Sequence, residues 1–308
     1  MLTASGLLVG ALAGCGLGAD TASDAEVTVV TSVYPLEWLA EEIVAEAPAD
    51  VAVTNLTEPG LDPHDLELSP QQIGEIGDAD LVFYIEGMQP AVDDAVAQHA
   101  SDQGTALNVA DVVSLREADP HGEGASEPDP HMWLDTEKFA AAGDAFAEQL
   151  TEVAGQVETN AETDTSAATE AAEAASTELT EIDEEYQDSL TDCDLRSFVV
   201  SHAAFGYLAE RYDLDQISIA GIEPETEPSP ARIREVADVV EDSGVDTIFT
   251  ETLASPQVAE TVAAETGTSV EVLDALEGLT DNSPGEDYPS VMRANLAELE
   301  AALGCAHD

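Results

Sequence analysis

Residues 197–211 read SFVVSHAAFGYLAER, and this stretch indicates the fold class because it contains a complete strand-to-helix unit. Residues 197–200 form a short apolar run with the length of a buried strand, and residues 204–211 have the spacing of a helix. His202 lies in the turn between them. Similar units recur on both sides of this stretch, and such alternation is typical of an α/β protein with a largely parallel sheet.

The other units form two groups separated by a long polar stretch. We expect strands at 27–30, 51–53, 81–85, 216–220, 246–250 and 270–273, and helices at 36–45, 71–76, 230–243, 257–266 and 289–303. The stretch between the groups, residues 136–190, contains no proline, and an apolar stripe near its end predicts a helix: Leu179, Ile182, Tyr186 and Leu190. The expected architecture is an α/β lobe at 27–156, a linker helix at 157–192 and a second α/β lobe at 193–308.

The charge of the chain is strongly negative. Its 308 residues contain 66 Asp and Glu against 7 Lys and Arg, for a formal net charge of −59. Such a surface repels nucleic acid and anionic lipid, which excludes both as partners. The acids are spread along the whole chain rather than collected in a tail, and this favours a solvated, salt-tolerant surface over a charged interaction arm.

The N-terminus has the pattern of an export signal. Residues 7–14 are small and apolar, too few to span a bilayer, and they end in Leu12-Ala13-Gly14-Cys15. We therefore expect a lipoprotein signal peptide at 1–14, cleavage before Cys15, lipid on its sulfur and a flexible tether at 15–26. The departure from the usual pattern is that no Lys or Arg precedes the apolar run, and the alternative is a frayed apolar terminus.

Two further cysteines, Cys193 and Cys305, remain once Cys15 is assigned to the lipid. An even pair in an exported chain predicts a disulfide. Two free buried thiols are the alternative. A pair of metal thiolates is less favoured because neither cysteine has a closely spaced partner.

Three histidines and one acid are candidates for a metal site. His202 and Asp274 each follow an expected strand, His64 lies in a loop after another, and His131 belongs to a second Asp-Pro-His segment. Ligands bind beyond the carboxyl ends of strands in open α/β sheets, so these side chains are expected to share a cleft. Three imidazoles and a carboxylate suit tetrahedral Zn²⁺. Taken singly, His64 is equally consistent with a turn residue and His202 with a helix-terminal residue.

The segments around these candidates resemble the signature segments of the zinc/manganese ABC-transporter solute-binding proteins, the ZnuA/TroA-like family. The resemblance runs from about residue 27 to the C-terminus, and five segments carry it: DPHDLELSP at 62–70, DPHMWLD at 129–135, SHAAFGYL at 201–208, GIEPETEPSP at 221–230 and LDALEGL at 273–279. It implies two α/β lobes bridged by one long rigid helix, with the metal between them. His64 and His131 would come from the first lobe, and His202 and Asp274 from the second.

The resemblance also implies a role in capture rather than catalysis. The protein would bind Zn²⁺ on the outer face of the cytoplasmic membrane, held there only by its lipid, and deliver the ion as a monomer to an ABC permease and its ATPase. A histidine at the third ligand position favours zinc over manganese, which stays the alternative. Glu251 and Glu223 are candidates for orienting a ligating histidine, or are simple surface acids. His121 is a remnant of the family's His-rich loop or a solvated loop residue, and His99 and His307 are expected on the surface.

Two other functions are open to the same residues. A zinc hydrolase would need three ligands, a water molecule and a general base, for which Glu251 is the candidate, but the fourth ligand and the lack of a His-Glu-x-x-His motif argue against it. A surface adhesin with a structural metal is the second. A chelated metal in the same fold is disfavoured by the His-rich set.

Overall fold

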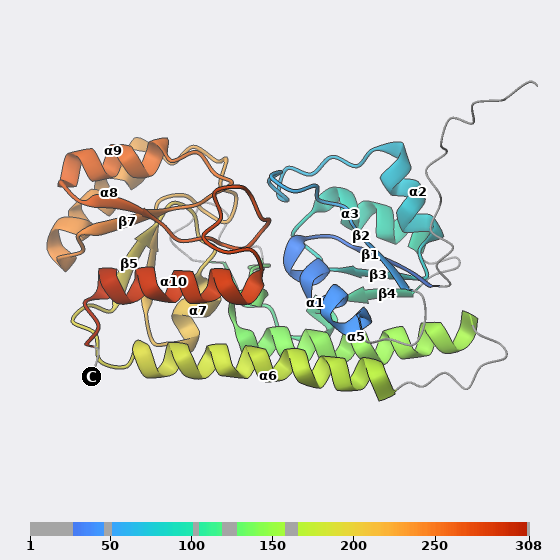
Figure 1. Ribbon diagram of the computed structural model, residues 1–308. Helices are drawn as coiled ribbons and strands as arrows, with labels where there is room; N and C mark the ends of the chain where they lie inside the picture. Colours follow the sequence, from blue (N-terminus) through green and yellow to red (C-terminus); the bar gives the residue numbers. More distant parts are fainter. Residues whose placement is uncertain (1–26, 46–50, 101–104, 119–127, 158–165, 307–308) are drawn as a thin grey trace, which may run out of the picture.

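The computed structural model describes residues 27–45, 51–100, 105–118, 128–157 and 166–306, and these form two α/β lobes side by side (Figure 1). The expected signal peptide (1–14), Cys15 and the tether lie outside the described residues, as do His121 and His307. Each lobe is built on a four-stranded parallel sheet, in the orders β2-β1-β3-β4 and β6-β5-β7-β8. The α/β prediction is therefore confirmed.

The strands and helices of each lobe alternate along the chain. The N-terminal lobe contains β1 (Val27–Thr31), α1 (Tyr34–Val44), β2 (Val51–Asn55), α2 (Pro70–Asp78), β3 (Leu81–Tyr84), α3 (Pro90–Ala95), the π-helical turn η1 (Val96–Ala100), β4 (Thr105–Asn108), α4 (Val109–Val112) and the 3₁₀ turn η2 (Met132–Leu134). The C-terminal lobe contains β5 (Ser197–Val200), α7 (Gly206–Arg211), β6 (Asp215–Ser218), α8 (Pro230–Ser243), β7 (Thr247–Thr250), α9 (Gln257–Thr266), β8 (Ser269–Val272) and α10 (Tyr288–Leu303).

Local sequence fixes where several of these helices begin and end. The side chain of Asp287 accepts a hydrogen bond from the backbone N–H of Ser290, and the Ser290 hydroxyl accepts one from the backbone N–H of Asp287, so α10 begins with a capping box. Gly304 then ends α10 in the left-handed conformation that glycine adopts without strain. The disulfide Cys193–Cys305 forms immediately beyond that glycine, as expected from the cysteine count, and it ties the end of α10 to the start of β5.

Two long helices lie between the lobes along the chain, and one of them bridges the lobes in space (Figure 1). α5 (Thr136–Val157) lies along the N-terminal lobe, and α6 (Ser166–Ser189) runs beneath both lobes (Figure 1). The linker helix therefore begins at Ser166 instead of the expected 157, because residue 157 is the last of α5. The predicted apolar stripe of α6 is buried, together with four alanines that precede it: Ala168, Ala171, Ala172, Ala175, Leu179, Ile182 and Tyr186.

One hydrophobic core passes through both lobes. It joins the inner faces of the two sheets to α1, α5, α6 and α10, whereas the outer face of each sheet has its own smaller core under α2 and α3 or under α8 and α9. At the junction, the rings of Trp38 and Tyr288 stack with centroids 4.9 Å apart. The Tyr288 hydroxyl donates to the carbonyl of Trp133, whose indole N–H donates to the carbonyl of Ala275 at 2.9 Å. The two lobes therefore share packed side chains and hydrogen bonds.

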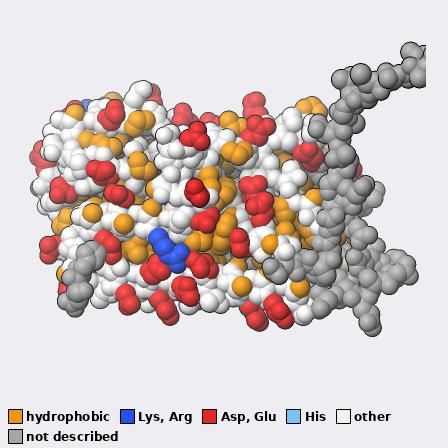
Figure 2. All heavy atoms as spheres, viewed as in Figure 1, with side chains coloured by type: hydrophobic (Ala, Val, Ile, Leu, Met, Phe, Trp, Pro, Cys, Tyr) orange, Lys and Arg blue, Asp and Glu red, His pale blue; other side chains and the backbone are white. Residues whose placement is uncertain are grey.

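Acidic side chains are spread across the visible face of both lobes, with few basic ones among them (Figure 2). This distribution agrees with the dispersal expected from the sequence. Among the described residues, none of the helices has the combination of length and apolar character required to cross a membrane.

Candidate metal centre

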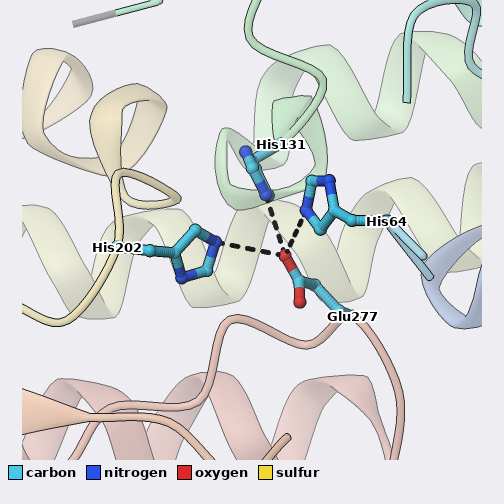
Figure 3. A group of neighbouring side chains, drawn as sticks. All are labelled: His64, His131, His202 and Glu277. Atoms are coloured by element: carbon cyan, nitrogen blue, oxygen red, sulfur yellow. Dashed lines mark hydrogen bonds and ion pairs between the residues drawn. The ribbon is translucent and has the colours of Figure 1, made fainter. Parts of the chain in front are cut away.

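Three histidines converge on a single carboxylate oxygen between the lobes (Figure 3). The Nε2 atoms of His64, His131 and His202 lie 3.1, 2.9 and 3.3 Å from Oε1 of Glu277. One donor atom from each of the four side chains lies within 4.8 Å of all the others. All four residues are buried, so this is an enclosed group with three nitrogen donors and one oxygen donor.

Both lobes contribute to the group. His64 lies between β2 and α2, and His131 lies just before η2, both in the N-terminal lobe. His202 follows β5 and Glu277 follows β8, so the C-terminal lobe supplies its two side chains from loops beyond the carboxyl ends of parallel strands. The structure thus brings together the three histidines that the sequence selected.

Asp274 is not a member of this group, which corrects the prediction for the fourth position. Its Oδ1 atom accepts the backbone N–H of Leu276 at 2.8 Å, and its Oδ2 atom accepts the hydroxyls of Thr252 and Ser283. Asn295 clamps the Asp274 backbone through both its N–H and its carbonyl.

Asp274 therefore shapes the loop from which Glu277 reaches the histidines. Within this loop Leu276 has a φ of 60°, which is unusual for a residue with a side chain, and the aspartate hydrogen bond supports that turn. Because the Asp274 carboxylate accepts the N–H of the residue two positions later, it is occupied in stabilising the turn. The longer side chain of Glu277 extends beyond this turn. Both acids belong to the same seven-residue motif, and their spacing in sequence does not separate these roles.

Opposite charges are concentrated in the buried group. Burial alone would lower the pKa of His64, but the nearby carboxylates of Glu277 and Glu223 raise it to about 10. Burial also opposes charge on His202, yet Glu251 and Glu277 hold its pKa well above the ordinary value. The histidines in turn hold the pKa of Glu277 well below its ordinary range, against the effect of burial. The protons on His64 and His202 thus neutralise a carboxylate that would otherwise be isolated.

The donor set fits a metal ion. The Nε2 atom of His202 is 3.3 Å from Glu277 but makes no hydrogen bond, so a buried donor points into the group unsatisfied. Three imidazole nitrogens with one carboxylate oxygen match tetrahedral Zn²⁺ in number and type. Binding of the ion requires the imidazoles to lose their protons.

Carboxylates also hold the outward-facing nitrogens of two of these histidines. The Nδ1 atom of His131 is 2.8 Å from Asp129, and the Nδ1 atom of His202 is 2.7 Å from Glu251. Glu251 also accepts the hydroxyl of Ser201. Such carboxylates fix the ring orientation and tautomer of a metal-binding histidine. The role expected for Glu251 agrees with this geometry, whereas no feature of the sequence pattern pointed to Asp129.

Asp129 is held in place from both lobes. Arg116 pairs with its Oδ2 atom at 3.1 Å, and the hydroxyl of Tyr207 in α7 donates to its carbonyl at 2.8 Å. The same hydroxyl accepts the backbone N–H of Arg116 at 2.8 Å. Gly206 leaves room for this arrangement, because a Cβ there would lie 1.5 Å from the Arg116 guanidinium. Of the other histidines, His99 is exposed in η1 and takes no part in the group.

Comparison with known proteins gives a consistent picture. The profile of the family described as "Zinc-uptake complex component A periplasmic" matches residues 29–302. Zinc-binding protein AdcA of Streptococcus pyogenes is 33% identical over 305 residues, covering 92% of this chain and 57% of the relative. The chain thus spans little more than half the length of AdcA. The high-affinity zinc uptake system protein ZnuA of Bacillus subtilis is 30% identical over 297 residues, with 92% and 90% covered.

Among solved structures, the laminin-binding protein Lmb of Streptococcus agalactiae is similar over almost its whole length. It has a TM-score of 0.76 and 29% sequence identity, with 90% of this chain and 99% of that chain covered. Lmb is described as a bifunctional protein with adhesin and metal transporting activity.

Proposed function

The chain belongs to the ZnuA family of zinc-uptake components, and we propose that it captures Zn²⁺ outside the cytoplasm and delivers it to the permease of an ABC importer. One observation carries this proposal: the Nε2 atoms of three buried histidines, drawn from two lobes, point at one oxygen of Glu277. A site assembled from both lobes is suited to enclose an ion and to release it when the lobes separate.

Zinc is favoured as the cargo by the chemistry of the donors. Imidazole nitrogens bind zinc well, whereas manganese prefers oxygen ligands, and zinc also stands above manganese in the Irving–Williams order. The proposed ligands are His64, His131, His202 and Glu277, with Glu277 in the place first assigned to Asp274. Manganese stays the competing cargo that the experiment below tests.

The number of ligands supports capture over catalysis. Catalytic zinc sites have three protein ligands and an open position for water. Here a fourth donor, Glu277, points at the histidines, and Glu251 is engaged with His202 and Ser201 rather than free to act as a base. We therefore do not favour the zinc hydrolase.

The sequence pattern and the family support a proposed location outside the cytoplasm. We propose that the protein is exported, that Cys15 carries lipid and holds it at the outer face of the cytoplasmic membrane, and that it acts as a monomer with a permease and an ATPase. The lobe boundaries at 27–156 and 193–308, with the linker between them, are likewise part of this proposal.

Adhesion is the second candidate function, because Lmb is described as both an adhesin and a metal transporter. A deletion strain separates the two. Loss of growth under zinc chelation, restored by added zinc, supports uptake, whereas normal growth with loss of binding to host surfaces supports adhesion.

A competitive titration tests the proposed cargo. The metal-stripped protein is titrated with Zn²⁺ and Mn²⁺ at pH 7.5 in high salt, which screens the acidic surface. One tightly bound zinc per chain that resists excess manganese supports the proposal. Several weakly bound ions, lost as salt is raised, would mean that surface carboxylates collect cations and that the buried group is not the site. Tight manganese binding would replace zinc as the cargo.

A further inference from the structure

The outward-facing nitrogen of His64 differs from those of the other two histidines. Asp129 and Glu251 lie 2.8 and 2.7 Å from the Nδ1 atoms of their histidines, and their side chains are 0% and 5% exposed. The carboxylate nearest to His64 Nδ1 belongs to Glu223, at 3.7 Å, and its side chain is 52% exposed. The first two pairs are at hydrogen-bond distance with buried carboxylates, whereas in the third the two atoms are farther apart and the carboxylate is exposed to solvent.

The pairs differ also in how they are placed in the fold. Asp129 and His131 belong to one lobe, and Glu251 and His202 belong to the other. Glu223, in contrast, lies in the loop between β6 and α8 of the C-terminal lobe, whereas His64 belongs to the N-terminal lobe. The first two pairs therefore move as units when the lobes move, and only the pair between Glu223 and His64 crosses the cleft.

His64 requires an acceptor that its own segment does not supply. The Asp-Pro-His segments of His64 and His131 each place an aspartate two residues before the histidine, and Asp129 accepts both the backbone N–H and the ring N–H of His131. Asp62 accepts only the backbone N–H of His64, at 2.9 Å. The Nδ1 atom of His64 is buried and has no hydrogen-bond partner. Once Nε2 of His64 binds an ion, Nδ1 carries a proton that needs an acceptor.

The loop that carries Glu223 is fixed next to another ligand. The carbonyl of Gly221 accepts the backbone N–H of Ala203, the residue after His202, and the carbonyl of Glu223 accepts the N–H of Thr226. The backbone of Glu223 therefore follows the C-terminal lobe closely. A shortening of 3.7 Å to hydrogen-bond distance requires a displacement of less than about 1 Å.

We propose that Glu223 positions His64 across the cleft, and that formation of this contact is the final step that locks the ion in place. This inference rests on the proposed function and adds its release step. Separation of the lobes breaks the Glu223 contact while Asp129 and Glu251 stay with their histidines. His64 is then the first ligand to lose its orientation, so the ion leaves from the His64 side.

Substitution at Glu223 tests this proposal by its effect on zinc dissociation. Glu223→Ala removes the acceptor and Glu223→Gln keeps a neutral one, while Glu225→Gln, at an exposed position of the same loop, is the charge-matched control. Zinc release to a chelator is followed by stopped flow. We expect release to be about 10-fold or more faster in Glu223→Ala, intermediate in Glu223→Gln and unchanged in Glu225→Gln, since outer partners change metal affinity by roughly 10–100-fold.

A second readout separates positioning from a general structural role. Proton NMR of the zinc-loaded protein reports each ring N–H, and Glu223→Ala should alter the His64 signal while those of His131 and His202 stay in place. The metal-free variant should still unfold in a single cooperative transition, which shows that the fold is retained. Equal release rates in wild type and Glu223→Ala, or a shift of all three ring signals, would overturn the proposal. A wild-type protein that fails to bind zinc would instead refute the proposed function.

Discussion

The hydroxyl of Tyr207 in the C-terminal lobe donates to the carbonyl of Asp129 in the N-terminal lobe, over 2.8 Å. Asp129 in turn orients the ring of His131, so a residue outside the ligand set links the second lobe to a ligand in the first. The Tyr207 hydroxyl is also the acceptor for the backbone of Arg116. The inter-lobe contact and the orientation of His131 are therefore parts of one hydrogen-bond network.

Replacement of Tyr207 by phenylalanine should weaken both folding and zinc binding. The substitution leaves the buried carbonyl of Asp129 without its donor, which costs about 1–3 kcal/mol. Denaturant unfolding of the metal-free protein measures this loss, and zinc affinity should fall with it. Tyr84→Phe, at the end of β3, is the matched control, because the Tyr84 hydroxyl makes no hydrogen bond within the described part of the chain. Equal effects of the two variants would contradict the prediction.

Glu277 and Asp274 should respond differently to loss of charge. Glu277→Gln replaces the carboxylate on which the histidines converge by a neutral amide, whose oxygen is a much weaker zinc ligand, so zinc affinity should fall by more than the roughly 10–100-fold expected for an outer partner. Asp274→Asn keeps the size of the side chain that shapes the loop, so zinc affinity should fall by no more than the roughly 10–100-fold expected for an outer partner. Thermal stability should also fall in this variant. Calorimetric titration and thermal unfolding of both variants check this pair of predictions. A larger loss of affinity for Asp274→Asn would restore Asp274 as the ligand.

Zinc binding should release protons, and the affinity should rise with pH. The pKa of His64 is about 10 in the metal-free protein, so its ring is protonated at neutral pH and must lose a proton to bind zinc. Each released proton changes the affinity by up to about tenfold per pH unit. Calorimetry in two buffers with different ionisation heats counts these protons. A heat that is independent of the buffer would contradict the prediction.

The same shift affects the stability of the metal-free protein. The folded-state pKa of His64 is above its ordinary value of 6.5, so the stabilisation is fully present below about pH 6.5 and is lost as the pH rises through about 10. The pKa of Glu277 is lowered, so its contribution is present above its ordinary value of 4.5 and is lost at more acidic pH. The free energy of unfolding of the metal-free protein, measured by chemical denaturation across this pH range, should therefore show a broad maximum. Bound zinc should abolish the decrease on the alkaline side.

Loss of the disulfide should reduce stability without changing zinc binding. Cys193 and Cys305 are 112 residues apart, and closing a loop of that size stabilises a protein by about 4–5 kcal/mol in the chain-entropy model. The bond lies between the end of α10 and the start of β5, at the opposite end of β5 from His202. Urea unfolding of Cys193→Ser/Cys305→Ser should show the loss, while its zinc titration should match that of wild type.

Helices and strands with clear sequence signals were predictable, and those with weak sequence signals were not. Residues 230–243 and 257–266 match α8 and α9 because Ser229 caps one start and Gly244 and Gly267 end the helices. β4 was missed because a strand of four residues with partly exposed side chains carries little apolar pattern. α3 and α4 are too short to show a helical repeat.

The three histidine donors of the candidate site were predictable from the sequence, whereas the carboxylate donor and part of the surrounding hydrogen-bond network were not. Strand-end positions selected His202 and the loop containing Glu277, because the carboxyl ends of parallel strands lie at one edge of a sheet. The choice between Asp274 and Glu277 depends on which side chain the loop uses for its own turn, which only the fold reveals. Asp129 and Asp62 occur in identical tripeptides, yet Arg116 and Tyr207 hold only Asp129, and these partners come from distant parts of the chain.

The core that passes through both lobes sets a thermodynamic limit on how far the protein opens. Burial of apolar surface is worth roughly 25 cal/mol per Å², so lobes that separated enough to wet 400 Å² of this core would lose about 10 kcal/mol. That is as much as the entire folding stability of an ordinary domain. Opening must therefore expose only a small apolar area to solvent. The heat capacity change of zinc binding should be correspondingly small. Under the proposed function, release of the ion would therefore depend on breaking a few polar contacts at the cleft, since the lobes resist being pulled apart.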